Sequence, residues 1–376
     1  MSEILYTINP DRNVPWNDIP QLPIREELYR TIEIMEKLGD AKAALARLQG
    51  RSVVIPNQGL LINTISLQEA KISSAIENIF TTDDDLYKAY SDKNTETNGA
   101  SKEVLKYREA LWSGFNYLKK SGKFDQNYFI RVFQEIKQTA DTIRPVFLNT
   151  TIKQGGTGPN AGQVIYTPPR ELAVIQNRLD NIVNFVNDDE QFKIDHLLKM
   201  AIVHFQFEAV HPFRDGNGRT GRVFNINYLT NKGLLDVPIL FLSRYILDHK
   251  EDYYSGLMGV SQRGNWKNWL LFMLRAVEST SNNTFDKIND IVTAKDLILE
   301  HIKKDDKKFR NPEELVEHLF TQPFTKVKHL VDAGIYSENT SRDYLNRLCF
   351  LQVLEKKEIA GHHYYLNLEL YRILSE

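Results

Sequence analysis

Apolar residues recur at every third or fourth position along most of this chain, the spacing that gathers them on one face of an α-helix. In residues 194–210 this stripe includes Leu198 and Phe205. A second stripe, in residues 223–229, stops at Gly233, a residue type that commonly ends helices. The pattern predicts a mainly helical fold in which a short polar segment separates two consecutive helices.

Two stretches interrupt the helical pattern. In residues 152–170, a cluster of turn-forming residues precedes the short strand GQVIYTP. The turn formers are Gly155, Gly156, Gly158, Pro159, Asn160 and Gly162. From about residue 295, the tail reads as helix, turn and helix, followed by a hairpin with Gly361 at its turn. This order resembles a winged-helix domain, so small β-elements are expected beside the helices.

Composition narrows the class of protein. The chain has 376 residues, 42% of them hydrophobic, and no apolar run approaches the roughly 20 residues of a membrane span. Its N-terminus lacks the positive-then-apolar pattern of a secretion signal. Cys349 is the only cysteine, which excludes an intramolecular disulfide and fits a reducing compartment. We expect a multidomain cytoplasmic protein without membrane contact, and the net charge of −2 argues against a protein that coats nucleic acid.

The polar segment between the two helices, residues 211–222, reads HPFRDGNGRTGR. It opens the second helix, where unpaired N–H groups and the macrodipole favour anions. Gly216 and Gly218 are expected to allow positive φ and a close approach to a ligand, so that successive N–H groups form an anion-binding nest. Arg219 and Arg222 lie three residues apart, and their guanidinium groups suit phosphate. The segment therefore predicts a polyphosphate site.

Two further residues of this segment point to chemistry beyond binding. Asp215 is its only carboxylate, and one carboxylate together with substrate phosphates is the usual way to hold Mg²⁺. His211 ends the first helix, where it can act as a base toward an incoming nucleophile. Pro212 is expected to end that helix, and Phe213 to fix the loop on the core.

The segment resembles the signature of the Fic family, His-x-Phe-x-Asp/Glu-Gly-Asn-Gly-Arg-x-x-Arg. The matching residues are His211, Phe213, Asp215, Gly216, Asn217, Gly218, Arg219 and Arg222. The resemblance implies a Fic-type helical bundle that transfers AMP from ATP to a Tyr, Thr or Ser hydroxyl of a target protein, or of the chain itself, and releases pyrophosphate. Gly218 stands where a lysine marks the branch of the family that phosphorylates its target, which favours adenylyl transfer.

The same resemblance implies roles for these residues. His211 would deprotonate the target hydroxyl, Asp215 would hold Mg²⁺ (with Mn²⁺ as the alternative ion), and Phe213 would be a structural pin. The expected nucleotide-binding residues of the segment are Gly216, Asn217, Gly218, Arg219, Thr220, Gly221 and Arg222. Of these, Arg219 and Arg222 would take the outer phosphates.

A family resemblance also extends to regions outside the segment. In the Fic family a β-hairpin flap covers the active site and aligns the main chain of the target by strand addition. Val164, Ile165 and Tyr166 are the candidates for that edge, although a mobile surface loop is the alternative interpretation. Family analogy places adenine or ribose contacts at Asp248 and Tyr254.

A short pattern near the N-terminus resembles the inhibitory helix of the family, Ser/Thr-x-x-x-Glu-Gly/Asn. Ser73, Glu77 and Asn78 fit it within an expected helix at about residues 66–80, in which Ser73 and Glu77 share a face. The resemblance implies that Glu77 pairs with Arg222 and so occupies the clamp for the γ-phosphate. An ordinary exposed glutamate is the alternative, and in some family members this residue helps to hydrolyse AMP from the target.

The expected organisation has three parts. Residues 1–95 form an N-terminal helical region with the inhibitory helix, residues 96–290 the Fic catalytic domain, and residues 291–376 the winged-helix domain. The polar residues 81–100 are expected to form a loop or boundary, and residues 281–290 to lead into the tail.

The tail supports an alternative function, that of a transcription regulator that binds DNA. Residues 310–376 hold eight Lys and Arg against ten Asp and Glu. Because DNA affinity depends chiefly on cations, this balance favours a module that binds protein or forms a homodimer. DNA binding stays open through Arg342, Arg347, Lys356 and Lys357.

A second alternative is a metallohydrolase that uses His204, Glu208 and His211. Their spacing of four and three residues puts them near one helical face. The chain lacks a His-Glu-x-x-His pattern, however, and Pro212 breaks the helix directly after the third candidate. His204 and Glu208 are better interpreted as a pair on the helix that leads to the polyphosphate site.

Overall fold

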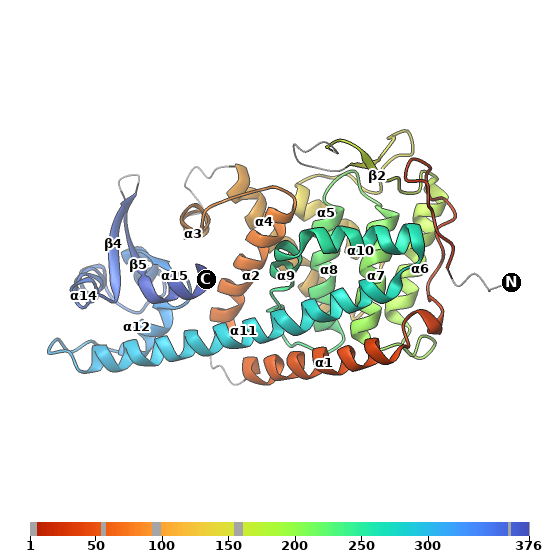
Figure 1. Cartoon of the computed structure of the whole chain (residues 1–376). Helices are drawn as coiled ribbons and strands as arrows, with labels where there is room; N and C mark the ends of the chain where they lie inside the picture. The colour runs from red at the N-terminus through yellow and green to blue at the C-terminus, as the bar shows by residue number, and fades with distance from the viewer. Residues whose placement is uncertain (1–5, 54–57, 92–98, 154–160, 360–361, 376) are drawn as a thin grey trace.

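The computed structural model describes residues 6–53, 58–91, 99–153, 161–359 and 362–375. Helices dominate, and two small antiparallel sheets accompany them, which confirms the predicted fold class. Figure 1 shows a helical bundle joined by the long helix α11 to a smaller C-terminal part. Within the described residues, no helix has the length and apolar character needed to cross a membrane.

The N-terminal part is helical, as expected. Its elements are η1 (Glu26–Leu28), α1 (Ile32–Val53), α2 (Gln58–Ile76) and α3 (Asp83–Ser91). Helix α3 replaces part of the loop expected at residues 81–100. The Thr82 hydroxyl accepts a hydrogen bond from the Asp85 N–H, while Leu86 and Tyr87 are buried. Capping and two apolar anchors therefore outweigh the polar composition.

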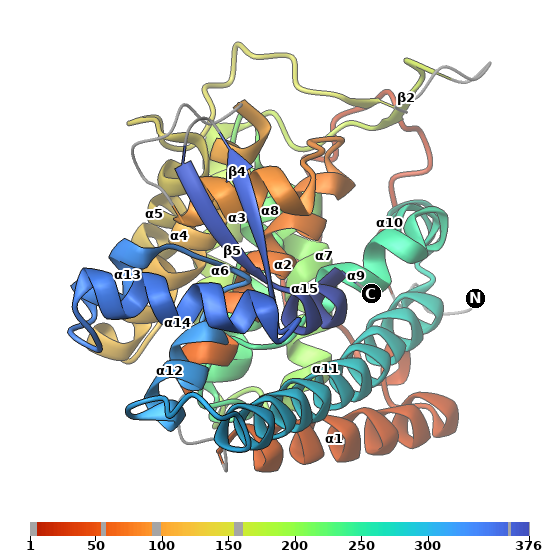
Figure 2. The same ribbon diagram turned by 90° about the vertical axis from the view of Figure 1, so that its left-hand side faces the viewer.

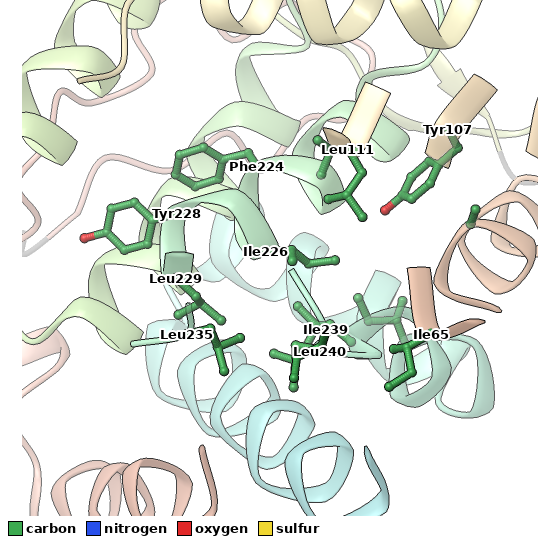
Figure 3. Packing of buried hydrophobic residues seen from close by; sticks show 14 of the residues in the cluster. Ile65, Tyr107, Leu111, Phe224, Ile226, Tyr228, Leu229, Leu235, Ile239 and Leu240 are labelled. Carbon is green, nitrogen blue, oxygen red and sulfur yellow. The ribbon is translucent and has the colours of Figure 1, made fainter. Parts of the chain in front are cut away.

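The central bundle surrounds helix α8. Its helices are α4 (Gly99–Ser121), α5 (Gln126–Lys137), α6 (Leu172–Asn187), α7 (His196–Val210), α8 (Asn217–Asn231), α9 (Leu242–Asp248) and α10 (Lys250–Arg263). Figure 3 shows Phe224, Ile226 and Tyr228 of α8 pointing in different directions into the core. The helix also buries polar side chains, and Asn227 donates to the Tyr128 hydroxyl at 3.0 Å. Helix α8 is therefore buried on every side, although many of its residues are polar.

The predicted pair of helices around the polar segment is confirmed. Helix α7 ends at Val210, and the next residue, His211, has a left-handed φ of 49° that stops the helix. Helix α8 begins directly after Gly216, which has a φ of 78°. Gly233, with a φ of 69°, follows the end of α8, as the sequence pattern predicts.

A short hairpin lies over the bundle. Strand β1 (Ile152–Lys153) pairs antiparallel with β2 (Val164–Tyr166), and β2 is at the top of the view in Figure 1. The expected strand is thus present. Among the expected turn formers, Gly162 has a φ of 79°. The other five, Gly155, Gly156, Gly158, Pro159 and Asn160, lie outside the described residues.

Helix α11 (Trp266–Lys303) connects the two parts of the molecule. It lies alongside α1 in both Figure 1 and Figure 2. The expected lead-in at residues 281–290, and the boundary after it, fall inside this helix. Ile288, Ile291 and Ala294 continue its buried stripe, and Ser281 and Thr284 are buried as well, while Asn283, Asp286 and Asp290 are exposed.

The C-terminal part fits the expected winged-helix order of helix, turn, helix and hairpin. Its elements are α12 (Pro312–Leu319), β3 (Phe324–Thr325), α13 (Val327–Asp332), α14 (Glu338–Phe350), β4 (Leu354–Ile359), β5 (His362–Asn367) and α15 (Leu368–Ser375). The strands form one antiparallel sheet in the order β3-β5-β4. Gly361, expected at the hairpin turn, lies outside the described residues. Helix α15 packs against α2 and α11.

Candidate active site

A cavity of about 140 Å³ opens between α7, α8, α10, the β1–β2 hairpin and the end of α2. Its lining brings together His211, Arg222 and Glu77, which lie far apart in the sequence. Tyr166, Glu208 and other residues complete the wall. The space is smaller than the roughly 300–1,000 Å³ of typical ligand pockets. The ion pair of Arg222 and Glu77 forms part of the wall of this space.

His211 presents a neutral imidazole to this cavity. Its Nδ1 lies 3.3 Å from the Glu208 carbonyl oxygen, which can only accept. Nδ1 therefore carries the proton, and Nε2 keeps a lone pair. Burial, together with the charge of Arg144, lowers the His211 pKa to about 4. A free lone pair at neutral pH is what a general base requires.

Arg144 holds the loop that carries His211, a role that the sequence gave no signal for. Its Nε donates to the His211 carbonyl at 2.7 Å, and its backbone N–H donates to the Pro212 carbonyl at 2.9 Å. A second guanidinium nitrogen donates to the Pro169 carbonyl, beyond the hairpin. The side chain is 1% exposed. One buried cation thus ties the loop to the segment after β2.

Phe213 and Asn217 fix the loop from inside. Phe213 is fully buried and stacks on Phe133, with ring centroids 4.2 Å apart. The Asn217 side chain accepts from the Phe213 N–H at 2.9 Å and donates to its carbonyl at 2.8 Å. Asn217 was expected to bind phosphates, yet both polar atoms of its side chain brace the loop. Its second Nδ2 hydrogen and its backbone N–H are the donors that remain for a ligand.

Gly216 and Gly218, near the start of α8, are required to be glycine for different structural reasons. Gly216 takes the positive φ that the sequence analysis expects, and its N–H donates to the Asp215 carboxylate at 2.7 Å. Gly218 lies within the helix and has no positive φ, unlike the expectation. A Cβ at Gly218 would instead overlap the Glu77 carboxylate. Gly218 therefore provides the space in which Glu77 approaches α8.

Asp215 lies at the edge of the site with a largely exposed side chain. Its carboxylate accepts from Lys137 at 2.7 Å. Partial burial opposes ionisation, but Lys137, the Gly216 N–H and Arg219 together lower the Asp215 pKa. A single ionised carboxylate fits an Mg²⁺ ion that takes most of its ligands from phosphates and water. Lys137 occupies one oxygen and would have to move aside.

Arg222 is the most heavily engaged residue of the cavity. Its Nε donates to the Ser73 hydroxyl at 2.8 Å, and a terminal nitrogen donates to the Ser73 carbonyl at 3.0 Å and to Glu77 at 2.9 Å. Burial opposes its charge, but Glu77, Tyr253 and Tyr107 together raise the Arg222 pKa. Asn78, with a φ of 61°, turns the chain after α2 and places Glu77 just beyond the helix end.

The other motif residues of α8 lie outside the cavity lining. Arg219 is 2% exposed and pairs with Glu103 of α4 at 2.9 Å, so it points away from Arg222. The Thr220 hydroxyl donates to the Gly216 carbonyl within the first turn of α8. Gly221 packs against His204 and Glu208, which leaves no space for a Cβ. Thr220 and Gly221 thus shape the helix rather than face the cavity.

Glu208 and His204 lie behind Arg222. Glu208 lines the cavity, and its Oε1 is buried with no hydrogen-bond partner among the described residues. Burial raises the Glu208 pKa to about 8, because Arg222 offsets that burial only in part. His204 uses one ring nitrogen on the Tyr253 hydroxyl at 2.8 Å and the other on Asn225 at 3.1 Å. These contacts leave His204 no nitrogen for a metal, which argues against the metallohydrolase alternative.

The hairpin and α10 complete the wall. Ile165 and Tyr166 of β2 line the cavity, and the Tyr166 hydroxyl donates to the Ala209 carbonyl at 2.7 Å. Val164 pairs with Lys153 in the hairpin. Tyr254, which is expected to contact adenine or ribose, lines the cavity. Its neighbour Tyr253 also lines the cavity, although it is buried like a core residue.

Asp248 is a predicted site residue that lies on a different surface. It pairs with Arg244 at 2.9 Å at the exposed end of α9. It lines a separate crevice, together with residues of α2, α11 and α15. Because α10 starts just after Asp248, the chain turns there and carries Tyr254, but not Asp248, to the cavity.

Comparison with known proteins agrees with this geometry. Residues 35–116 match the sequence model described as Fic/DOC family N-terminal, and residues 125–229 match the Fic/DOC family model. Residues 295–370 match the C-terminal domain of SoFic-like protein adenylyltransferases. The chain belongs to the Fic family. The central Fic match includes the whole segment from His211 to Arg222.

Curated Fic relatives share only part of the chain. A probable protein adenylyltransferase of Aquifex aeolicus is 38% identical over 81 residues, which cover 22% of this chain and 24% of that protein. Protein adenylyltransferase fic-1 of Caenorhabditis elegans is 29% identical over 106 residues, covering 28% of this chain and 20% of that protein. The chain thus spans at most about a quarter of the length of these relatives.

Solved structures share the Fic fold over a longer stretch. A Fic family protein from Desulfovibrio desulfuricans gives a TM-score of 0.51 at 17% identity, covering 92% of this chain and 98% of that one. Fic-1 from Caenorhabditis elegans gives 0.51 at 18% identity, covering 69% of this chain and 74% of that one. At these identities the likeness concerns the fold alone.

Proposed function

We propose that this chain is a protein adenylyltransferase, which transfers AMP from ATP to a side-chain hydroxyl of a protein target or of itself. The strongest support is the position of His211, whose Nε2 lone pair shares one cavity with Arg222 at the start of α8. The relatives named above are described as protein adenylyltransferases. The base His211, the anion-binding Arg222 and the strand β2, which would align a target chain, thus lie around one cavity.

His211 acts as the base in this reaction. A serine, threonine or tyrosine hydroxyl is a weak nucleophile at neutral pH, so it must lose its proton as it attacks. Nε2 takes that proton while the new O–P bond to the α-phosphorus forms and the bond to pyrophosphate breaks. Arg144 fixes the imidazole by holding the His211 carbonyl. The resulting imidazolium stays next to the Glu208 carbonyl, which stabilises it.

The start of α8 stabilises the charge that develops on the phosphates. Its free N–H groups and helix dipole are fixed before the substrate arrives, so no reorganisation is needed. Arg222 is buried and permanently charged, and it becomes available to the outer phosphates once Glu77 leaves. Asp215 would hold Mg²⁺, which neutralises phosphate charge when bound. Arg219 reaches the phosphates only if it leaves Glu103.

Glu77 restrains the enzyme. It occupies Arg222, and it fills the space beside Gly218 into which the outer phosphates would extend. Its carboxylate would also repel them at close range. Ser73 reinforces the arrangement through its two contacts with Arg222. In this arrangement Glu77 keeps ATP from reaching a reactive position.

Intact-mass spectrometry tests this proposal. After incubation with ATP and Mg²⁺, the Glu77→Gly variant is expected to gain an adenylyl group, on itself or on an added protein, at least about tenfold faster than the parent. His211→Ala, introduced into the Glu77→Gly background, should abolish the gain. Glu36→Gly, on the exposed face of α1, is the control for loss of a carboxylate.

The result that would contradict the proposal is an unchanged mass for the Glu77→Gly protein when calorimetry shows that ATP is bound. Replacing ATP by CTP, UTP or GTP in the same assay defines the nucleotide. A gain in mass that matches a phosphoryl group would assign the chain to the phosphorylating branch instead.

Removal of AMP is a second candidate activity, because Glu77 faces the same cavity as His211. A carboxylate in that position can orient water toward a phosphorus atom. A target modified by the Glu77→Gly variant should then lose its AMP on incubation with the parent protein and Mg²⁺. The Glu77→Gln variant, which cannot act as a base, should leave the modification intact. Equal loss with both proteins would exclude this role for Glu77.

A further inference from the structure

We propose that the C-terminal part binds double-stranded DNA in the groove between α13, α14 and the β4–β5 hairpin. This groove measures about 670 Å³ and is separate from the cavity around His211. Lys326, Lys328, Arg342 and Lys356 line it, together with one acidic residue, Glu338. The inference does not depend on the proposed adenylyl transfer.

In the C-terminal part, half of the basic residues gather in the groove while most acidic residues lie elsewhere. The net charge of this part does not reveal that separation. Residues 310–376 hold eight Lys and Arg and ten Asp and Glu. Four of the eight cations line the groove, but only one of the ten acids does. The remaining surface therefore carries the excess of negative charge. A local cationic face attracts a polyanion even when the domain as a whole is slightly acidic.

The structure also shows which of the four basic residues suggested as DNA contacts from the sequence lie in the groove. Arg347 is held by Asp305 through two hydrogen bonds, at 3.0 and 2.6 Å, and Lys357 lies 3.8 Å from Glu355. Neither lines the groove. Arg342 and Lys356 do, and Lys328 of α13, which the sequence did not suggest, joins them.

Arg342 can bind DNA although it contacts Glu338. The two are one helical turn apart on α14, 2.6 Å from each other, and their side chains are 55% and 66% exposed. An exposed pair of this kind contributes at most about 1 kcal/mol, so a phosphate or a base edge can replace Glu338. Arginine is also the side chain that most often reads guanine.

The arrangement of the cations favours a duplex over an acidic peptide. Helix α14 presents the exposed polar residues Asn339 and Arg342 in its first turns. Lys328 lies on α13, before it, and Lys356 on β4, after it, so cations flank this helix on two other elements. A polar helix fits the major groove of DNA, and flanking lysines then meet the phosphates on either side.

Fluorescence anisotropy of a labelled duplex of about 20 base pairs, roughly two helical turns, tests the proposal with the full chain. Affinity should fall steeply between about 50 and 200 mM salt. The double variant Lys328→Ala/Lys356→Ala should bind about tenfold more weakly and show a salt slope smaller by about two, one for each lost phosphate contact. The control, Lys357→Ala/Arg372→Ala, removes the same charge outside the groove and should bind like the parent protein.

Thermal melts establish that both double variants are folded, so that a loss of binding reports on the groove. Equal affinity of the groove variant and the control would overturn the proposal. So would an absence of duplex binding at about 50 mM salt. Binding of poly-glutamate, but not of the duplex, with the same dependence on Lys328 and Lys356, would replace DNA by an acidic protein as the partner.

Discussion

At the scale of single residues, burial decides which groups around Arg222 carry charge. His204 is fully buried, which lowers its pKa to about 3, and burial raises the pKa of Glu208, in the cavity wall, to about 8. At neutral pH both are therefore uncharged. Glu77 remains the carboxylate that pairs with Arg222. The proposed inhibition thus depends on the ion pair between Glu77 and Arg222, beside these two neutral side chains.

The low pKa of His204 makes the stability of the fold depend on pH. The folded pKa, about 3, lies below the unfolded value of 6.5, so the unfolded chain binds the proton more readily. The contribution of His204 to stability is complete above pH 6.5 and is lost as pH falls toward 3. At about pH 5 the expected loss is roughly 2 kcal/mol.

Urea unfolding at neutral and acidic pH measures this effect. The free energy of unfolding of a His204→Gln variant should fall by less than that of the parent protein between the two conditions. Parallel pH dependences of the two proteins would show that His204 does not titrate in this way.

The sequence identifies the residues of the loop that carry the chemistry, but it does not identify the residues that hold this loop in place. His211, Asp215 and Arg222 form a contiguous pattern with a recognisable spacing. Arg144 acts from 67 positions away and belongs to no local pattern. Glu208 resembles an ordinary helix carboxylate until the fold packs it against Gly221 of α8 and encloses its Oε1. Where no motif marks them, contacts between distant segments cannot be inferred from one sequence.

At the scale of elements, α3 holds α2, the proposed inhibitory helix, in place. Asp83 of α3 pairs with Lys71 of α2 at 2.6 Å and accepts from Gln68 at 3.1 Å. The Lys250 side chain, from α10, donates to the Ile76 carbonyl at the other end of α2, at 2.6 Å. These contacts fix the helix that presents Ser73 and Glu77 to Arg222.

Weakening the α2–α3 contact should therefore relieve inhibition. The Asp83→Asn variant loses a half-buried ion pair, worth on the order of 1–2 kcal/mol, so the rate of adenylyl incorporation should rise about fivefold to thirtyfold. Asp85→Asn is the matched control, because Asp85 lies on the same helix with an exposed side chain. Equal initial rates for the two variants would contradict this role of α3.

The elements also show where sequence patterns mislead. The acidic run at the start of α3 looks like a loop, but three carboxylates in a first turn favour a helix N-terminus. The polar residues 281–290 look like a linker, but they belong to α11, which buries Ser281 and Thr284 and exposes others. In both cases a few buried apolar positions decide the structure.

At the scale of the whole molecule, α11 is the connection between the catalytic bundle and the C-terminal part. Proline in the middle of a helix costs about 3 kcal/mol or more. An Ala294→Pro variant, which places it on the buried face of α11, should unfold in two calorimetric transitions where the parent shows one. The control Asp296→Ala, on the exposed face, should keep the single transition. An unchanged single transition for Ala294→Pro would mean that α11 does not connect the two parts mechanically.

The most direct test of adenylyl transfer follows the two ends of ATP separately. The Glu77→Gly variant is incubated with Mg²⁺ and ATP labelled either at the α- or at the γ-phosphorus, and the label retained by protein is measured. Label from the α-position should be incorporated, and it should disappear when His211→Ala is added, while the γ-label leaves with pyrophosphate. Retention of the γ-label, or of neither label, would contradict the account.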